Sequence, residues 1–127
     1  MTETALDTSV STDDSSRELA LRVADVLAET PAANTVVLDI RELSSFADFF
    51  VICSGENERQ LRAITEKLQE ELRKDGVRPQ RLEGAPNSGW IVLDYNDVIV
   101  HVFDQELRDF YKMERLWAEA PRLLAIQ

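Results

Sequence analysis

The feature of this sequence that most constrains its fold is the nearly continuous apolar run at residues 48–53 (DFFVIC). Successive side chains of a strand point to opposite faces of a sheet, so a strand that is apolar throughout has to be covered on both faces. The run therefore predicts a central strand in a sheet with helices packed on each side. Ser54 and Gly55 follow the run and are expected to end the strand.

Weaker β-rich segments supply the rest of this sheet. Residues 35–40 (TVVLDI) are rich in β-branched side chains, and residues 77–83 form a poorer candidate that Pro79 restricts to an edge. Residues 90–95 (WIVLDY) and 98–103 (VIVHVF) are also expected to be strands. We therefore expect a mixed sheet of about five strands covered by helices, an α/β fold.

The last two strands should form a hairpin. Only Asn96 and Asp97 separate them, which is typical of a tight turn although the usual glycine is missing. Period-two alternation places Trp90 and Asp94 on one side of the first of these strands, and Leu93 on the other.

Helical signals flank the strands. Ser15 and Glu18 fit a capping box at the start of a first helix. Asn57 is a candidate N-cap for a second helix that ends at Gly76, and residues 105–119 have the apolar spacing of a third.

Length and polarity indicate one domain at residues 15–120. Residues 1–14 offer little to bury and are predicted to be a disordered lead, and residues 121–127 are expected to be a short C-terminal tail. No apolar run approaches the roughly 20 residues of a membrane helix, and the start of the sequence lacks the pattern of a secretory signal. The single cysteine fits a reducing cytoplasm.

The charge balance favours a basic partner. Fourteen lysines and arginines stand against 24 aspartates and glutamates, a formal net charge of −10. Such a surface repels free nucleic acid and anionic membranes, because both need a positive patch on the protein.

A search for catalytic chemistry finds little. His101 is the only histidine, so a zinc site is not expected, and a buried structural role is favoured over a catalytic base. Cys53 lies among apolar residues and is interpreted as a packing residue. The turn at Ser54 and Gly55 could receive an anion, but Glu56 and Glu58 oppose phosphate there. We therefore predict no catalytic, cofactor-binding or metal-binding residues.

Residues 88–120 combine seven acidic and three basic residues with several aromatic side chains, which is typical of a protein interface with a basic partner. The alternative is that the aromatic residues are core, and we prefer it for Phe103, Phe110 and Trp117. The residues predicted to bind a partner are Trp90, Asp94, Asp97, Tyr111 and Glu114.

Four ordered segments resemble one known family. ADFFVICSG, GENERQLRAI, GWIVLDYNDVIVHVF and LRDFYKMERLW are similar to the serial motifs of the ribosomal silencing factor family, also called Iojap-related. The resemblance spans about residues 18–117 and implies a nucleotidyltransferase-like fold without the metal-binding acids, hence a protein that is not an enzyme and needs no cofactor.

The same resemblance implies a partner and a mechanism. Members of the family bind the large ribosomal subunit through its fourteenth ribosomal protein, block joining with the small subunit and so repress translation; organelle relatives are linked to large-subunit biogenesis. A cytoplasmic location is expected, as is a homodimer when the protein is free. Two alternatives remain open: a nucleotidyltransferase-like enzyme and a general protein-interaction adaptor.

Overall fold

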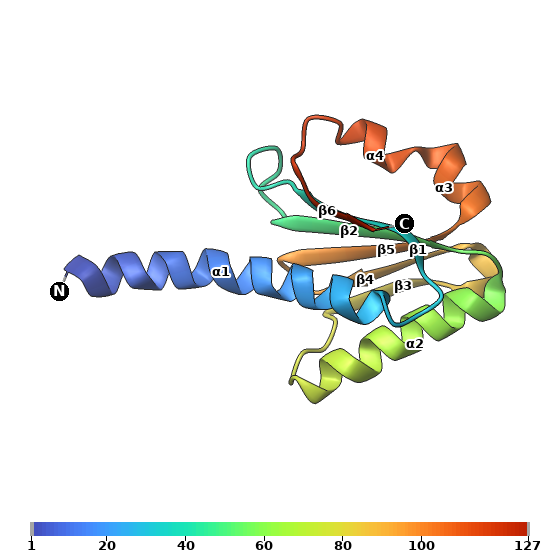
Figure 1. Ribbon diagram of the computed structural model, residues 1–127, viewed down its shortest axis with the longest axis horizontal. Coiled ribbons are helices and arrows are strands. Elements are labelled where there is room, and N and C mark those ends of the chain that lie inside the picture. The colour runs from blue at the N-terminus through green and yellow to red at the C-terminus, as the bar shows by residue number, and fades with distance from the viewer. Residues whose placement is uncertain (1, 127) are drawn as a thin grey trace.

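A six-stranded mixed sheet organises the computed structural model, which describes the backbone of residues 2–126 and the side chains of residues 15–126 (Figure 1). The strands lie in the order β3-β4-β5-β2-β1-β6. They span β1 Ala33–Asp39, β2 Phe49–Gly55, β3 Arg81–Ala85, β4 Trp90–Asp94, β5 Val98–Asp104 and β6 Arg122–Ile126. The helices are α1 Thr2–Leu27, α2 Glu58–Lys74, α3 Gln105–Tyr111 and α4 Met113–Leu116, with a short 3-10 turn at Pro86–Ser88.

The central strand lies where the apolar run predicts it, but Ser54 and Gly55, which are expected to end the strand, are its last two residues. All seven residues of β2 are buried, and β2 pairs with β5 in parallel and with β1 in antiparallel orientation. The expected mixed α/β sheet is confirmed, with six strands in place of about five.

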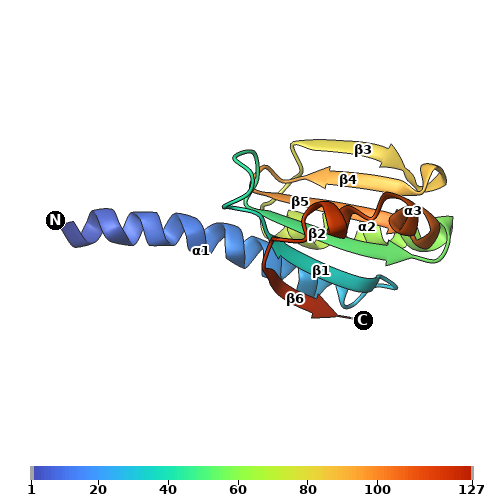
Figure 2. The ribbon, with the colours of Figure 1, turned by 90° about the horizontal axis from the view of Figure 1, so that it is seen from above.

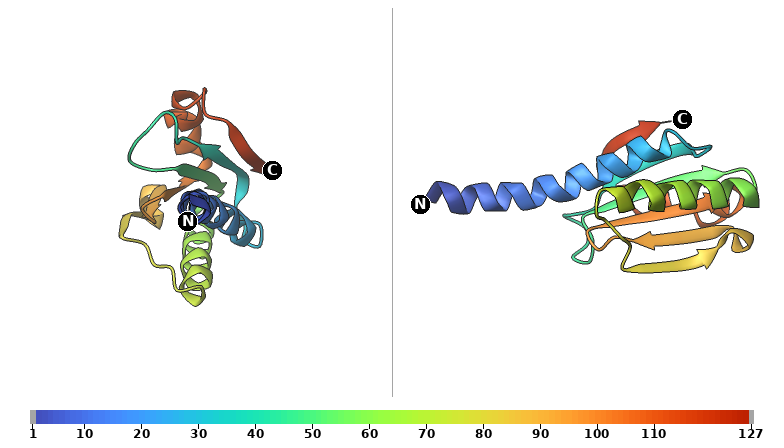
Figure 3. Two further views of the ribbon diagram at one scale, coloured as in Figure 1. Left: turned by 90° about the vertical axis from the view of Figure 1, so that its left-hand side faces the viewer. Right: turned by 90° about the horizontal axis from the view of Figure 1, so that it is seen from below.

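Helices cover both faces of the sheet. Figure 2 shows α3 and α4 lying across one face, and the right-hand view of Figure 3 shows α1 and α2 on the opposite face. The larger core lies under α1 and α2, where Leu27 and Leu68 pack with the sheet residue Val51. A smaller core, with Ile52 and Phe103 at its centre, lies under α3 and α4. The alternating burial along β4 fits this division, because its side chains point to the two cores in turn.

Helix α1 is longer than the sequence pattern predicts. Its N-terminal part extends beyond the sheet (Figure 1), and its buried Ser16 donates a 2.7 Å hydrogen bond to the Asp48 carboxylate before β2. The expected capping box at Ser15 and Glu18 is wrong, because the helix already continues on the N-terminal side of Ser15. The side chains of residues 1–14 lie outside the described residues, and the disordered lead stays a prediction.

The predicted N-cap of the second helix is confirmed. The Asn57 side chain accepts a 2.9 Å hydrogen bond from the backbone N–H of Gln60, and α2 begins at Glu58. An N-cap oxygen satisfies one of the backbone donors that the first turn of a helix leaves free.

The hairpin of β4 and β5 is also confirmed. Asn96 adopts a left-handed conformation with φ 76°, and its backbone N–H donates a 2.8 Å hydrogen bond to the Asp94 carboxylate. Asparagine tolerates this region better than most residues, so the turn closes without glycine. The weak strand candidate at residues 77–83 becomes β3, which starts later, at Arg81, and lies at an edge of the sheet.

The C-terminal region differs most from the expectation. The single helix predicted at residues 105–119 is wrong, because Lys112 has φ 49° and ψ 47° and separates α3 from α4. The expected tail at residues 121–127 includes β6, which pairs antiparallel with β1. A strand this short and half-exposed has no apolar alternation strong enough to stand out in the sequence.

Candidate partner-docking face

An aromatic cluster occupies the side of the sheet beneath α3 and α4. Its members come from three strands, the end of α3 and the segment after α4: Phe50, Trp90, His101, Phe103, Tyr111 and Trp117. Aromatic pairs with ring centroids this close add to stability beyond the area that they bury. Two of the predicted docking residues, Trp90 and Tyr111, belong to this cluster.

Trp90 is half-buried within this cluster. Its ring stacks on Phe103 at 4.9 Å between centroids and lies 4.9 Å from the ring of Tyr111. Its indole N–H donates a 3.3 Å hydrogen bond to Nδ1 of His101 on the neighbouring strand. Much of the Trp90 side chain is thus engaged inside the protein, although the residue as a whole is only half-buried.

His101 is a buried residue of this cluster, as the sequence interpretation favours. Burial disfavours the charged imidazolium and lowers the pKa of His101 from 6.5 to about 4. The ring is therefore neutral near pH 7. Because Nδ1 accepts the bond from Trp90, the proton of the neutral ring resides on Nε2, a buried atom with no hydrogen-bond partner among the described residues. Such a group is suited to structure rather than to proton transfer at neutral pH.

Glu114 has an internal partner. Both of its oxygens accept hydrogen bonds from the guanidinium of Arg108, at 2.9 and 3.0 Å, and the pKa of Glu114 is lowered by these bonds. Arg108 is only 6% exposed and donates a further bond of 2.8 Å to Oγ of Ser54. The pair ties α4 to α3 and to β2, so the Glu114 carboxylate is not a free acid at the rim of the face.

Sequence spacing gives no sign of this pair. Arg108 and Glu114 are six residues apart, whereas side chains meet on one helix at spacings of three or four. They meet because the chain turns at Lys112. For the same reason Tyr111 and Glu114, expected one turn apart on one helix, belong to two different helices.

The predicted acids of the hairpin lie apart from the aromatic residues. Asp94 is at the far end of β4 from Trp90, a distance of about 13 Å for four residues of extended chain. Asp97 is exposed at the turn, where its backbone carbonyl accepts bonds from Asp48 and Phe49. The structure thus brings together Trp90 and Tyr111 but not these two with Asp94 and Asp97.

The sequence analysis does not predict the exposure of two apolar side chains. Phe110 is 74% exposed and Leu116 is 78% exposed, whereas the apolar spacing assigns Phe110 to the core. That assignment is wrong because α3 ends at Tyr111, one residue later, and is too short to bury a full stripe. The preference for core is confirmed for Phe103, which is fully buried, and Trp117 packs edge-on against Phe50 at 5.1 Å.

The strand end at Ser54 and Gly55 is tightly packed. Both residues are buried at the end of β2, and a side chain on Gly55 would collide with Leu61 of α2. Arg108 places a cation against Ser54, where a metal-dependent transferase would need acids. Among the described side chains, no group of three histidine, cysteine or acidic residues could hold a metal ion.

Cys53 packs as an apolar residue in β2. It is fully buried, and burial raises the pKa of its thiol to about 12, which keeps it protonated. In the described part of the chain, no helix is both long and apolar enough to cross a bilayer.

Comparison with known proteins identifies the family and the fold of this chain. Residues 13–127 match the model of the family described as "Ribosomal silencing factor during starvation". A ribosomal silencing factor of Halalkalibacterium halodurans is 36% identical over 107 residues, which cover 84% of this chain and 92% of that protein. One from Bacillus subtilis is 32% identical, covering 80% of this chain and 86% of the relative.

Relatives extend to an organelle protein and to solved structures. A mitochondrial Iojap-related protein of Arabidopsis thaliana is 32% identical over 100 residues, covering 76% of this chain and 54% of that protein. A crystal structure from Bacillus halodurans superposes with a TM-score of 0.74 at 33% identity, covering 85% of this chain and 98% of the other.

Proposed function

This chain belongs to the ribosomal silencing factor family, and on that premise we propose that it docks on the large ribosomal subunit and sterically blocks joining with the small subunit. The observation that carries the proposal is the family match across residues 13–127. The bound domain acts by filling space that the small subunit requires, so no cofactor takes part. The partner on the subunit is its fourteenth ribosomal protein, and the site of action is the cytoplasm.

The exposed surface of α3 and α4 supports a docking role. Phe110, Tyr111 and Leu116 are all at least 46% exposed. Exposed aromatic and aliphatic side chains of this size are suited to enter pockets of a partner, and such anchors dominate the energy of protein interfaces. Of the predicted docking residues, Tyr111 and the exposed part of Trp90 adjoin this surface, whereas Asp94 and Asp97 contribute long-range attraction.

Net charge favours the same class of partner. A protein of net charge −10 is repelled by rRNA but attracted by basic ribosomal proteins, so its contact is made through protein. A general adaptor for basic proteins would also carry a negative net charge, but it would not explain the family match. A nucleotidyltransferase-like enzyme is disfavoured by the buried cation of Arg108 against Ser54.

Sedimentation of the purified protein with ribosomal subunits tests the function. The protein should travel with large subunits through a sucrose gradient and shift joined ribosomes toward separate subunits. Failure to sediment with large subunits would exclude the proposed function. The free protein is proposed to be a homodimer, which sedimentation equilibrium in the absence of subunits measures.

A matched pair of leucine variants tests the docking surface. Leu116→Ala removes an exposed side chain from α4, whereas Leu82→Ala removes a 48% exposed one from the edge strand β3. Both should leave stability nearly unchanged, and only Leu116→Ala should weaken sedimentation with large subunits, by roughly tenfold in affinity for a lost anchor. Equal binding by both variants would place the docking surface elsewhere on the protein.

A further inference from the structure

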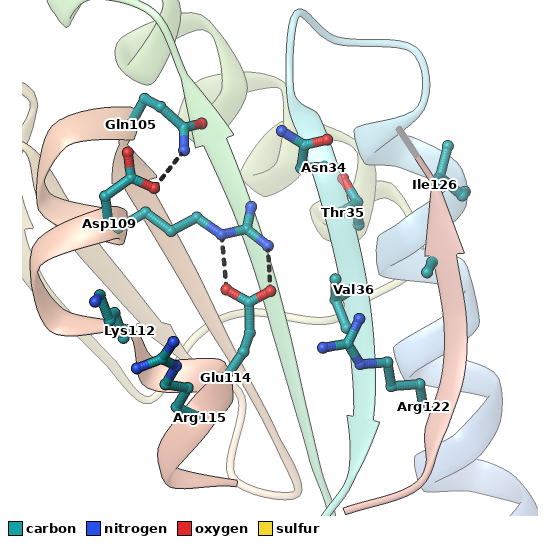
Figure 4. Close-up of a pocket in the computed structure, with 12 residues that line it drawn as sticks. Asn34, Thr35, Val36, Gln105, Asp109, Lys112, Glu114, Arg115, Arg122 and Ile126 are labelled. Atoms are coloured by element: carbon teal, nitrogen blue, oxygen red, sulfur yellow. Dashed lines mark hydrogen bonds and ion pairs between the residues drawn. The ribbon is translucent and has the colours of Figure 1, made fainter. Parts of the chain in front are cut away.

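A cavity of about 550 Å³ lies between the C-terminal helices and the edge of the sheet (Figure 4). Residues of α3 and α4 form one wall, and residues of β1 and β6 form the other. Its volume is in the range of small-molecule sites. The lining includes apolar residues of the strand wall, Val36, Ala125 and Ile126, together with four cations and two acids.

The lining is positive on a protein that is negative overall. The four cations are Arg108, Lys112, Arg115 and Arg122, and the two acids are Asp109 and Glu114. Both acids already have partners: Glu114 pairs with Arg108, and the Asp109 carboxylate accepts a 2.9 Å bond from the side-chain amide of Gln105.

The remaining cations stay available to a ligand. Lys112 and Arg115 form no ion pair or side-chain hydrogen bond within the described residues, and Arg122 is near Glu114 without a direct bond to it. Three cations that are free of a direct ion pair among the described residues thus line one cavity of a chain with 24 acidic residues.

The backbone at Lys112 supports a role for its side chain. Lys112 lies in the left-handed region, with φ 49° and ψ 47°, at a helix end where glycine or asparagine is usual. A lysine there costs conformational energy that either residue would avoid. The conformation turns the chain so that Lys112 and Arg115 line the same wall of the cavity (Figure 4).

We propose that this cavity binds a small organic phosphate ester without a divalent metal. A phosphate ester carries close to two negative charges and several acceptor oxygens, which matches two guanidinium groups and one ammonium group better than a single carboxylate does. The organic part of the ligand would lie against Val36, Ala125 and Ile126. An rRNA backbone is the less favoured occupant, because a recess of this size admits a small molecule whereas a helical backbone would touch only its rim.

Phenyl phosphate in EDTA-containing buffer is a suitable probe, and its binding can be monitored by the amide chemical shifts of the full chain. We expect saturable shifts at Lys112, Arg115, Arg122 and Ile126, and weaker effects with benzoate at equal ionic strength. No saturation up to about 10 mM phenyl phosphate would overturn the proposal, as would equal binding of benzoate. Saturable shifts at these residues with an rRNA fragment but not with phenyl phosphate would assign the cavity to rRNA instead.

The variants remove charge without disturbing the backbone. Lys112→Asn keeps a residue that accepts the left-handed conformation, so the combination of Lys112→Asn and Arg115→Gln should fold. It should weaken phenyl phosphate binding by at least roughly tenfold. The control is Arg59→Gln, which removes an exposed cation from α2 and should change binding less than about twofold. Equal weakening by the control would show nonspecific attraction and refute the site.

Discussion

At the scale of single residues, Trp90 has two roles that compete for the same side chain. The sequence suggests an interface anchor, whereas the structure shows its ring stacked on Phe103 and its N–H bonded to His101. A side chain with these contacts contributes to the folding of the smaller core, whatever its exposed part touches. The two roles are separable because one affects unfolding and the other affects binding.

Substitution of Trp90 should therefore destabilise the protein. We expect Trp90→Ala to lower the free energy of unfolding by about 3 kcal/mol, because it removes the stacked ring and leaves Nδ1 of His101 without its donor. Trp90→Phe keeps an aromatic ring and should cost only about 1 kcal/mol. Urea denaturation measures both. A Trp90→Ala protein of parental stability that no longer binds large subunits would instead identify an interface anchor.

His101 makes stability depend on pH. Its pKa is about 4 in the folded protein and 6.5 when exposed, so the unfolded chain takes up the proton first as the pH falls. The stabilisation is fully present above about pH 6.5 and is lost as the pH decreases toward 4, with a total of about 3 kcal/mol. Comparing urea denaturation of the parent with that of His101→Gln, which cannot titrate, isolates this effect. Parallel stability curves for the two proteins would contradict it.

At the scale of secondary structure elements, the two chain ends differ in what holds them. β6 pairs with β1, and its Leu123 and Leu124 pack on the larger core. Residues 1–14 lack an apolar stripe that could pack in the same way. The end that the sequence presents as a tail is thus the one that completes the sheet.

A pair of truncations tests this difference. Removing residues 121–127 should destabilise the domain by about 3 kcal/mol, because it exposes two half-buried leucines and leaves the β1 edge unpaired. Removing residues 1–14 should change the melting temperature by less than about 2 °C. Thermal unfolding measures both. A large loss in the second truncation would show that the N-terminal residues pack on the domain.

At the scale of the whole molecule, the excess of acidic residues sets the kinetics of encounter. A net charge of −10 attracts a basic protein over distances that salt screens. Asp97 at the exposed hairpin turn is one source of this field. The attraction acts on the approach of the partner rather than on the contacts of the final complex.

Association with the proposed partner, the fourteenth protein of the large subunit, should therefore slow as salt increases. Between 50 and 200 mM salt we expect the association rate to fall roughly tenfold, with a smaller change in the dissociation rate. Asp97→Asn should reduce the association rate at low salt and weaken the salt dependence of that rate. The control is Glu66→Gln on α2, which covers the opposite face of the sheet from α3 and α4, and it should change both quantities less. Stopped-flow fluorescence measures these rates, and an association rate that does not depend on salt would contradict the prediction.

The sequence by itself determined the parts of this protein whose signals are local. The unbroken apolarity of residues 48–53 required a strand covered on both faces, and β2 is that strand. Asn57 identified the start of α2, and two residues between β-rich runs identified the hairpin. Four ordered motifs indicated the family. Each of these signals can be recognised from consecutive residues of the chain, so no knowledge of distant contacts was needed.

Only the tertiary structure decided the arrangement of the chain after residue 104. The left-handed turn at Lys112 brings Glu114 to the buried Arg108, exposes Phe110, and opens the cavity beside β6. Helical periodicity cannot anticipate such a turn, since it treats residues 105–119 as one continuous stripe. The turn is stabilised by hydrogen bonds from Arg108 to Glu114 and to Ser54, a residue 54 positions earlier in the chain. A contact at that separation depends on the sheet, which places β2 beneath α3, and so it leaves no trace in the local sequence.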